Sequence, residues 1–341
     1  MAKKKKAKTK TVHKKAKKAR TKPKTKNKNV KKVNKAAKKQ KKISSAKYKK
    51  TITTKNKSKK PSRHHDHECK FTPVLNQYKP KPYKVIEAFR ETSDTVTLTI
   101  DMQVKHDPGQ FFQLSLPGIG ECPISICSDS EKVVKFNVRQ VGNMTNALAK
   151  LKKGDTLLIR GPYGRGYPMS SLKGNNLLII GGGCGVAPLK GIIDYIENHR
   201  DDYKEVKLFL GYRSPNDIIF KRELEEWKNQ YHLNVTVDKD LEPGSCYNYN
   251  VQEGFITKAL ENTHIDNHNK IVFVCGPPIM MKFVIGILKK KGFNDDQIFI
   301  SAERLMFCGI GVCCHCMIKD KYTCVDGPVF RYDEIAGFEE D

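Results

Sequence analysis

The sequence predicts an antiparallel β-barrel followed by an α/β domain with a parallel sheet, a small cysteine-rich C-terminal module and a disordered N-terminal tail. Three observations predict this organisation. Short β-branched and aromatic runs separated by turn residues fill residues 78–168, strands and helices alternate through residues 169–298, and four closely spaced cysteines lie within residues 299–341. Short strands at such spacing are typical of small barrels, and βα alternation is typical of a parallel sheet covered on both faces.

The predicted barrel contains five recognisable strands and one helix. The strands are expected at residues 83–89, 95–100, 110–116, 133–138 and 156–159. The helix is expected at residues 145–151 and is entered through Gly142 and Asn143.

The α/β domain has a regular alternation of elements. Strands are expected at residues 176–180, 206–210, 233–237 and 270–275, and helices at residues 188–198, 221–231, 254–261 and 278–291. Ligands of such a sheet bind beyond the carboxyl ends of its strands. The final residues, 299–341, hold too little apolar material for a core of their own, so we expect a bound metal centre to organise them.

The N-terminal tail, residues 1–70, contains the excess charge of the chain. Residues 1–60 hold 29 Lys and Arg and no Asp or Glu, whereas the remaining 281 residues hold 35 basic and 36 acidic side chains. Such a segment cannot bury enough apolar surface to fold, so we expect it to be disordered. A polycation binds nucleic acid, anionic membranes and acidic proteins without sequence choice. A solubilising role, polyanion binding and a nuclear or organellar address all stay open for this tail.

The 11 cysteines indicate metal binding rather than disulfides. No apolar run resembles a signal peptide or a membrane span, so we expect a cytoplasmic, reducing environment in which disulfides are rare. Cys308, Cys313, Cys316 and Cys324 follow the spacing C-x4-C-x2-C-x7-C, which is the close-then-distant pattern of plant-type [2Fe-2S] clusters. A zinc site stays open, although structural zinc sites usually have two C-x2-C pairs. Thiols with no ligand role also stay open, and Cys314 is expected to be one of them.

A glycine-rich turn at residues 181–188 follows the first strand of the α/β domain and leads into a helix. Free backbone N–H groups at such a turn favour a bound phosphate. The turn departs from G-x-G-x-x-G because Pro188 takes the place of the third glycine. No acidic residue follows the second strand to bind a ribose, and Arg213 lies there instead. The turn therefore indicates a phosphate cradle without a conventional dinucleotide fingerprint.

Several motifs together resemble the ferredoxin-NADP reductase superfamily. The α/β domain has Gly183-x-Gly185-x-x-Pro188, Gly211-Tyr-Arg213 and Cys275-Gly276-Pro277-Pro278, and the barrel has Pro123-Ile124-Ser125-Ile126 and Gly142-Asn143-Met144-Thr145. Cys122 and Ile124 replace the Arg and Tyr that many members have in their flavin motif. The C-terminal part of the chain reads Glu-Arg-x-Met-x-Cys-Gly-Ile-Gly-x-Cys-x-x-Cys and is closed by Cys-x-Asp-Gly-Pro-Val-Phe. This element resembles one branch of the superfamily. That branch contains gamma subunits of soluble NAD(P)-linked hydrogenases and the corresponding subunits of anaerobic sulfite reductases, with electron-transfer subunits of dihydroorotate dehydrogenases more distant.

The resemblance implies an FAD-binding barrel at residues 78–168, an NAD(P)-binding domain at 169–298 and a [2Fe-2S] module at 299–341. It implies an oxidoreductase subunit that passes electrons between NAD(P)H and a catalytic partner subunit of hydrogenase or sulfite reductase type. No general acid or base is expected, because hydride transfer depends on positioning, and Cys275 is either a nicotinamide contact or a core thiol. The expected cofactor-binding residues are Pro123, Ile124, Ser125, Ile126, Gly142, Asn143, Met144, Thr145, Gly183, Gly185, Pro188, Arg213, Cys275, Gly276 and Pro277, and the expected cluster ligands are Cys308, Cys313, Cys316 and Cys324.

A second hypothesis belongs to a different class of protein. In it, the lysine-rich tail binds nucleic acid and the reductase body serves as a redox sensor. The sequence leaves the choice between NADH and NADPH open.

Overall fold

The computed structural model describes residues 76, 78–242, 247 and 249–337. The lysine-rich tail at residues 1–70 lies outside this range, so its disorder and its polyanion binding stay predictions. Among the helices that the structure does describe, none is long and apolar enough to cross a membrane.

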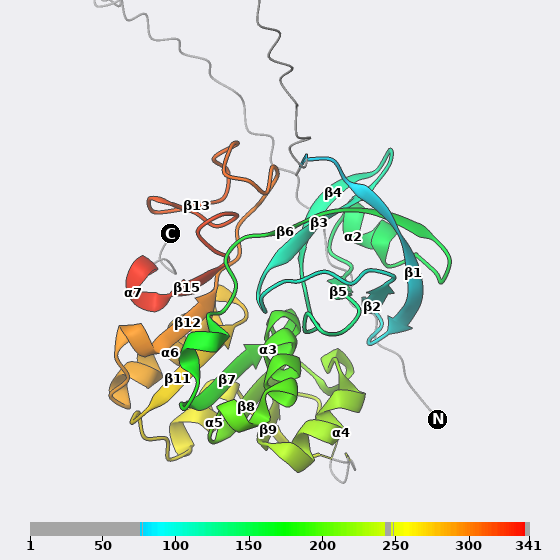
Figure 1. The fold of residues 1–341 in the computed structure, drawn as a ribbon. Helices are drawn as coiled ribbons and strands as arrows, with labels where there is room; N and C mark the ends of the chain where they lie inside the picture. Colours follow the sequence, from blue (N-terminus) through cyan, green and yellow to red (C-terminus); the bar gives the residue numbers. More distant parts are fainter. Residues whose placement is uncertain (1–75, 77, 243–246, 248, 338–341) are drawn as a thin grey trace, which may run out of the picture. The chain divides into compact units, whose positions relative to one another are not determined.

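The first part of the described chain is an antiparallel sheet, as predicted. Its strands are labelled in Figure 1, and their order is β4-β3-β6-β1-β2-β5. A bridge between Ile126 and Phe136 joins the two edges of the sheet. Val96, Leu98 and Ile100 of one strand pack into its apolar interior. The strands are β1 (Lys81–Arg90), β2 (Thr95–Ile100), β3 (Phe111–Leu116), β4 (Gly120–Ser125), β5 (Lys135–Arg139) and β6 (Thr156–Tyr163).

Helix α2 (Asn143–Leu148) lies between β5 and β6 and begins two residues before the predicted start. The Thr145 hydroxyl accepts hydrogen bonds from the backbone N–H groups of Val141 and Gly142, each at 3.0 Å. The Thr145 side chain stabilises the start of the helix, because its oxygen accepts hydrogen bonds from backbone N–H groups that precede the first turn.

The second part is a seven-stranded sheet in the order β10-β9-β8-β7-β11-β12-β15. All neighbouring strands are parallel except β12 and β15, which are antiparallel. The strands are β7 (Asn176–Gly182), β8 (Val206–Tyr212), β9 (His232–Val237), β10 (Val251–Glu253), β11 (Lys270–Cys275), β12 (Ile298–Ser301) and β15 (Val329–Arg331). The main helices are α3 (Val186–Asn198), α4 (Lys221–Gln230), α5 (Ile256–Asn262) and α6 (Pro278–Lys290).

Alternation along β7 shows why this sheet is covered on both faces. Leu177 and Ile179 belong to an apolar cluster with residues of α3 and α4, whereas Leu178 and Ile180 belong to another with residues of α5 and α6. Successive side chains of a strand point to opposite faces, so an almost continuous apolar strand requires helices on both sides. The predicted α/β architecture is confirmed.

The last part of the C-terminal module, residues 299–341, is organised differently from the prediction. Phe330 and Ile335 join the apolar cluster around α6, and β15 pairs with β12. The module also contains β13 (Met317–Ile318), β14 (Lys321–Tyr322) and α7 (Tyr332–Ile335). The expectation that a metal centre alone organises residues 299–341 is therefore wrong for the last part of the module, because the neighbouring sheet supplies its core.

Candidate functional site

The glycine-rich turn packs closely against the end of β11. A Cβ atom on Gly185 would lie 2.6 Å from the backbone carbon and oxygen of Cys275 and 2.6 Å from the Cα of Gly276. Only glycine allows this approach. Pro188 is the third residue of α3, where its missing N–H has no intrahelical partner to lose. The predicted residues Gly185, Pro188, Cys275 and Gly276 thus meet at the carboxyl edge of the sheet.

The barrel reaches the same turn through Arg139 at the end of β5. Its guanidinium group hydrogen-bonds the Cys184 thiol and forms an ion pair with Asp94, with Nε 2.8 Å from Oδ2. Arg139 lies three residues before Gly142, which is the N-cap of α2. The glycine-rich turn is therefore in contact with the strand that leads into the predicted phosphate-binding segment at residues 142–145.

The predicted flavin segment lies on β4. Pro123, Ile124 and Ser125 are half-buried, and Ser125 pairs with Phe111 of β3. Ile126 is fully buried and pairs with Phe136. Ile126 is therefore a core residue of the barrel, whereas its three predecessors keep some access to solvent.

Glu303 is a candidate that the sequence prediction did not include as a site residue. Its carboxylate interacts electrostatically with the thiols of Cys275 and Cys184. Burial among protein atoms raises the pKa of Glu303, although part of its side chain is exposed. Cys275 itself is buried, and its side chain hydrogen-bonds Ser301. The sequence signal that could have identified Glu303 was its position as the first residue of the C-terminal cysteine element.

The four predicted cluster ligands lie in two pairs. The side chains of Cys308 and Cys313 are hydrogen-bonded to each other, and so are those of Cys316 and Cys324. Cys316 and Cys324 are buried against Phe111 of the barrel. Within the described residues, no group of three or more His, Cys, Asp or Glu side chains is arranged to hold a metal ion. The two pairs are not independent, because the charge of Cys308 also acts on the Cys324 thiol.

Backbone N–H groups surround these sulfur atoms. Those of Ile310, Val312 and Cys313 donate to the Cys308 sulfur at 3.3–3.5 Å, and that of Gly311 donates to the Cys324 sulfur at 3.1 Å. Burial opposes ionisation of the Cys308 thiol, but the three N–H groups lower its pKa. A backbone hydrogen bond from His315 is the main cause that lowers the pKa of Cys313 to about 7. Thiolates with N–H donors are the ligand set that iron–sulfur centres require, so these residues fit such a centre.

Barrel residues hold the first turn of this loop. Arg160 donates to the carbonyl oxygens of Cys308 at 2.8 Å and Phe307 at 3.4 Å, and Gln113 donates to Phe307 at 3.4 Å. Arg160 also forms an ion pair with Glu121 of β4. Arg160 is 9% exposed and Gln113 is fully buried. The loop is therefore attached to β6 and β3, which belong to the same sheet as β4 and its predicted flavin segment.

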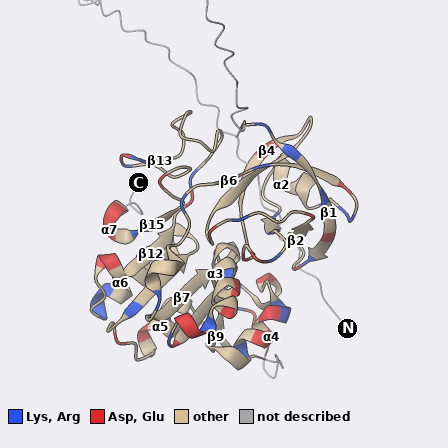
Figure 2. Cartoon of the chain, in the orientation of Figure 1, with Lys and Arg blue, Asp and Glu red and all other residues tan. Residues whose placement is uncertain are grey.

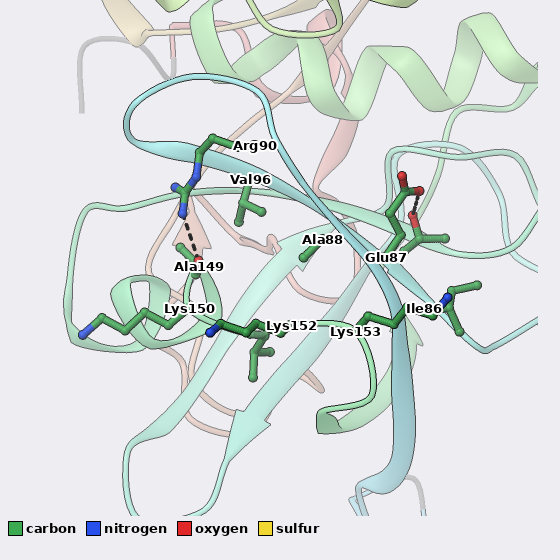
Figure 3. A pocket seen from close by; sticks show the side chains of 11 residues that line it. Ile86, Glu87, Ala88, Arg90, Val96, Ala149, Lys150, Lys152 and Lys153 are labelled. Carbon is green, nitrogen blue, oxygen red and sulfur yellow. Dashed lines mark hydrogen bonds between the residues drawn. The ribbon is translucent and has the colours of Figure 1, made fainter.

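A separate groove of about 1070 Å³ lies on the barrel, lined by residues of β1, β2 and the segment after α2 (Figure 3). Arg90, Lys150, Lys152 and Lys153 are among its lining residues, and Arg90 donates to the carbonyl of Ala149 at 3.2 Å. None of the described cofactor-site residues predicted from the sequence lines this groove. We therefore assign it no part in the candidate site.

Family comparisons agree with the two C-terminal parts of the chain. The model of an oxidoreductase NAD-binding domain matches residues 179–285. The model of an iron–sulfur cluster binding domain of dihydroorotate dehydrogenase B matches residues 303–336. The second match covers all four paired cysteines.

Known proteins resemble the chain over most of its described length. It is 34% identical to sulfhydrogenase 2 subunit gamma of Pyrococcus furiosus over 280 residues, which cover 76% of this chain and 96% of that protein. It is 31% identical to a probable dihydroorotate dehydrogenase B (NAD(+)) electron transfer subunit of Methanocaldococcus jannaschii over 264 residues, or 77% and 93% of the two chains.

Solved structures share the fold. An NADH-dependent reduced ferredoxin-NADP oxidoreductase studied for flavin-based electron bifurcation superposes with a TM-score of 0.60 and 26% identity, covering 74% of this chain and 91% of that one. A ferredoxin NADP+ reductase from Neisseria gonorrhoeae with bound FAD and NADP has a TM-score of 0.55 and 20% identity, covering 65% and 98%. The chain therefore belongs to the ferredoxin-NADP reductase superfamily, in the family of sulfhydrogenase gamma subunits and dihydroorotate dehydrogenase B electron transfer subunits.

Proposed function

We propose that the chain is an electron-transfer subunit that binds FAD on the barrel, NAD(P)H on the parallel sheet and a [2Fe-2S] cluster in the C-terminal module. It passes electrons between NAD(P)H and a catalytic partner subunit of hydrogenase, sulfite reductase or dihydroorotate dehydrogenase type. Bound FAD supplies the exchange between a two-electron hydride and single electrons. The observation that carries this proposal is the attachment of the cysteine loop to the barrel through Arg160 and Gln113.

The residues of this chain act by binding and positioning. Ser125 and its neighbours on β4 contact the flavin ring, and residues 142–145 bind the flavin pyrophosphate. The turn containing Gly183, Gly185 and Pro188 binds the phosphates of the nicotinamide nucleotide, and Arg213 lies at its adenosine end. Cys275, Gly276 and Pro277 border the nicotinamide. Close packing of Gly185 on Cys275 fixes the phosphate-binding turn relative to the residues that border the nicotinamide.

The C-x4-C-x2-C-x7-C spacing of the four cysteines supports a [2Fe-2S] cluster over a single zinc ion. Each iron of a [2Fe-2S] cluster takes two cysteines, and Cys308–Cys313 and Cys316–Cys324 are two such pairs. Structural zinc sites usually have two C-x2-C pairs, whereas these four cysteines contain one. The N–H groups that donate to Cys308 and Cys324 add the hydrogen bonds that tune cluster potentials.

The surface around the cysteines supports a permanent protein partner. Between residues 305 and 325, five large apolar side chains are exposed, with exposed fractions from 41% for Met317 to 74% for Leu305. The others are Phe307, Val312 and Val325. Residues 305–318 contain no Lys, Arg, Asp or Glu, whereas charged residues lie on both sides of this stretch (Figure 2). An exposed apolar cluster depleted of charge is typical of the core of a stable interface, whereas transient electron carriers dock mainly through charge.

Anaerobic purification of the full chain tests this function. We expect flavin and iron–sulfur absorption, about two iron ions per chain, and an EPR signal that develops when NADH or NADPH is added. Metal analysis that finds zinc without iron would replace the cluster assignment. A preparation reconstituted with FAD, iron and sulfide that neither nucleotide reduces would refute the proposal as a whole.

A further inference from the structure

Arg213 and Asp238 lie side by side at the carboxyl edge of the sheet. Arg213 follows the last residue of β8 and Asp238 follows the last residue of β9, and these last residues, Tyr212 and Val237, are paired in register. The backbone N–H of Asp238 donates to the Tyr212 carbonyl at 2.9 Å, which continues the pairing by one step. Both side chains are exposed.

The positive charge of Arg213 acts on the carboxylate of Asp238. Burial raises the pKa of Asp238 and the positive charge of Arg213 opposes that rise. The next two charges of the same loop, Lys239 and Asp240, form their own ion pair at 3.5 Å. Ser214, beside Arg213, donates its hydroxyl hydrogen to Asp217 at 2.7 Å. Asp238 is therefore an exposed acidic residue next to Arg213 at this edge of the sheet.

The strand order places this pair at one end of the nucleotide site. In the sequence of strands β9-β8-β7-β11, the phosphate-binding turn follows β7 and Cys275 ends β11. If the nicotinamide lies at the β11 side, as proposed above, the adenosine half extends past β7 toward β8 and β9. Ile256 of α5 packs over the end of β8, since a Cβ on Gly211 would lie 2.9 Å from it. The preceding Phe255 is 65% exposed and offers an apolar face beside the same edge.

We propose that Asp238 makes this protein select NADH over NADPH. The carboxylate accepts hydrogen bonds from the 2′- and 3′-hydroxyl groups of the adenosine ribose, repels a 2′-phosphate and offsets the positive charge of Arg213. Acidic groups at strand ends select NAD in this way in other dinucleotide-binding sheets, and arginine accommodates the 2′-phosphate of NADP. This inference rests on the proposed nucleotide site and adds the specificity of that site.

The test compares Asp238→Asn with the matched control Asp240→Asn, which removes the same charge from the same loop two residues away. For the full chain, kcat/KM is measured for NADH and NADPH with an artificial dye as acceptor. Wild-type protein should prefer NADH by at least about tenfold, which corresponds to 1.4 kcal/mol. D238N should reduce that preference at least about tenfold, chiefly through a lower KM for NADPH, while D240N stays within about threefold of wild type.

Calorimetric titration gives a readout that does not depend on turnover. The probes are ADP-ribose and 2′-phospho-ADP-ribose, which lack the nicotinamide. D238N should strengthen binding of the phosphorylated probe relative to ADP-ribose, and D240N should not. A wild-type preference for NADPH, or a D238N protein with unchanged probe selectivity, would overturn the inference. Failure of both nucleotides to reduce the protein, with probe selectivity as expected, would instead count against the proposed electron transfer.

Discussion

Replacing Arg160 by Met should separate the cysteine loop from the barrel without affecting the nucleotide domain. The substitution removes the hydrogen bonds to the carbonyls of Cys308 and Phe307 and the ion pair with Glu121. A hydrogen bond from a charged donor contributes about 1.5–3 kcal/mol and a partly exposed ion pair about 1 kcal/mol or less. The ion pair with Glu121 lies within the barrel, so only the hydrogen bonds to the loop count toward its attachment. Attachment should therefore weaken by about 1.5–3 kcal/mol, which is at least about a tenfold increase in the detached population of the loop.

Rapid-mixing spectroscopy distinguishes this effect from general damage. Reduction of the flavin by NADH should keep its wild-type rate in R160M, whereas reduction of the cluster should slow at least about tenfold, or the cluster signal in EPR should fall by a similar factor. Arg331→Met is the control, because it removes an exposed arginine that pairs with Asp333 in the same module. An R160M protein with full cluster content and an unchanged rate of cluster reduction would refute the argument that this arginine holds the loop.

Three further predictions concern other parts of the molecule. Gly185→Ala should raise the KM for the nucleotide at least about tenfold and lower the free energy of unfolding, measured in thermal melts, by about 1–3 kcal/mol. Gly286→Ala is the control at an open helical position, and it should be neutral or stabilising in the same melts. Equal effects of the two substitutions would contradict the close-packing argument. Cys316→Ser should abolish the EPR signal and halve or remove bound iron, while Cys314→Ser should retain both, and loss of iron only in C314S would reassign the ligands. Lys190→Met breaks the buried ion pair between Lys190 and Asp194, which are 2.9 Å apart, and should lower the free energy of unfolding in denaturant by about 3–5 kcal/mol. A loss below about 1 kcal/mol would show that the pair is not effectively desolvated.

The regular part of the fold could be predicted from the sequence because its periodicity is strong. β7 is an apolar run followed by glycines, and β8 and β11 repeat that pattern before a polar turn. The short strands β10, β12 and β15 were not predicted, because runs of three or four residues have no clear period and depend on partners distant in the chain.

Site residues were predictable where chemistry and spacing are local. The four cysteines and the glycine-rich turn are of this kind, since their motifs lie within short segments. Asp238 was missed because an acidic residue was sought after the second strand of the α/β domain, whereas it follows the third. Neighbouring parallel strands end at the same edge, so residues 25 positions apart become adjacent. Arg160 resembles any strand arginine in sequence, and only its burial and its carbonyl partners reveal its role.

The pairing of β15 with β12 has a consequence for the biogenesis of the metal centre. The strand and the following helix α7 belong to the apolar core beside α6, and Arg160 and Gln113 hold the other end of the cysteine segment. Small metal-dependent modules collapse only when their ion is present, because nothing else orders their ligands. Here contacts that involve no metal ion hold both ends of the segment, so we expect the apo-protein to be folded in this region before iron and sulfide are delivered.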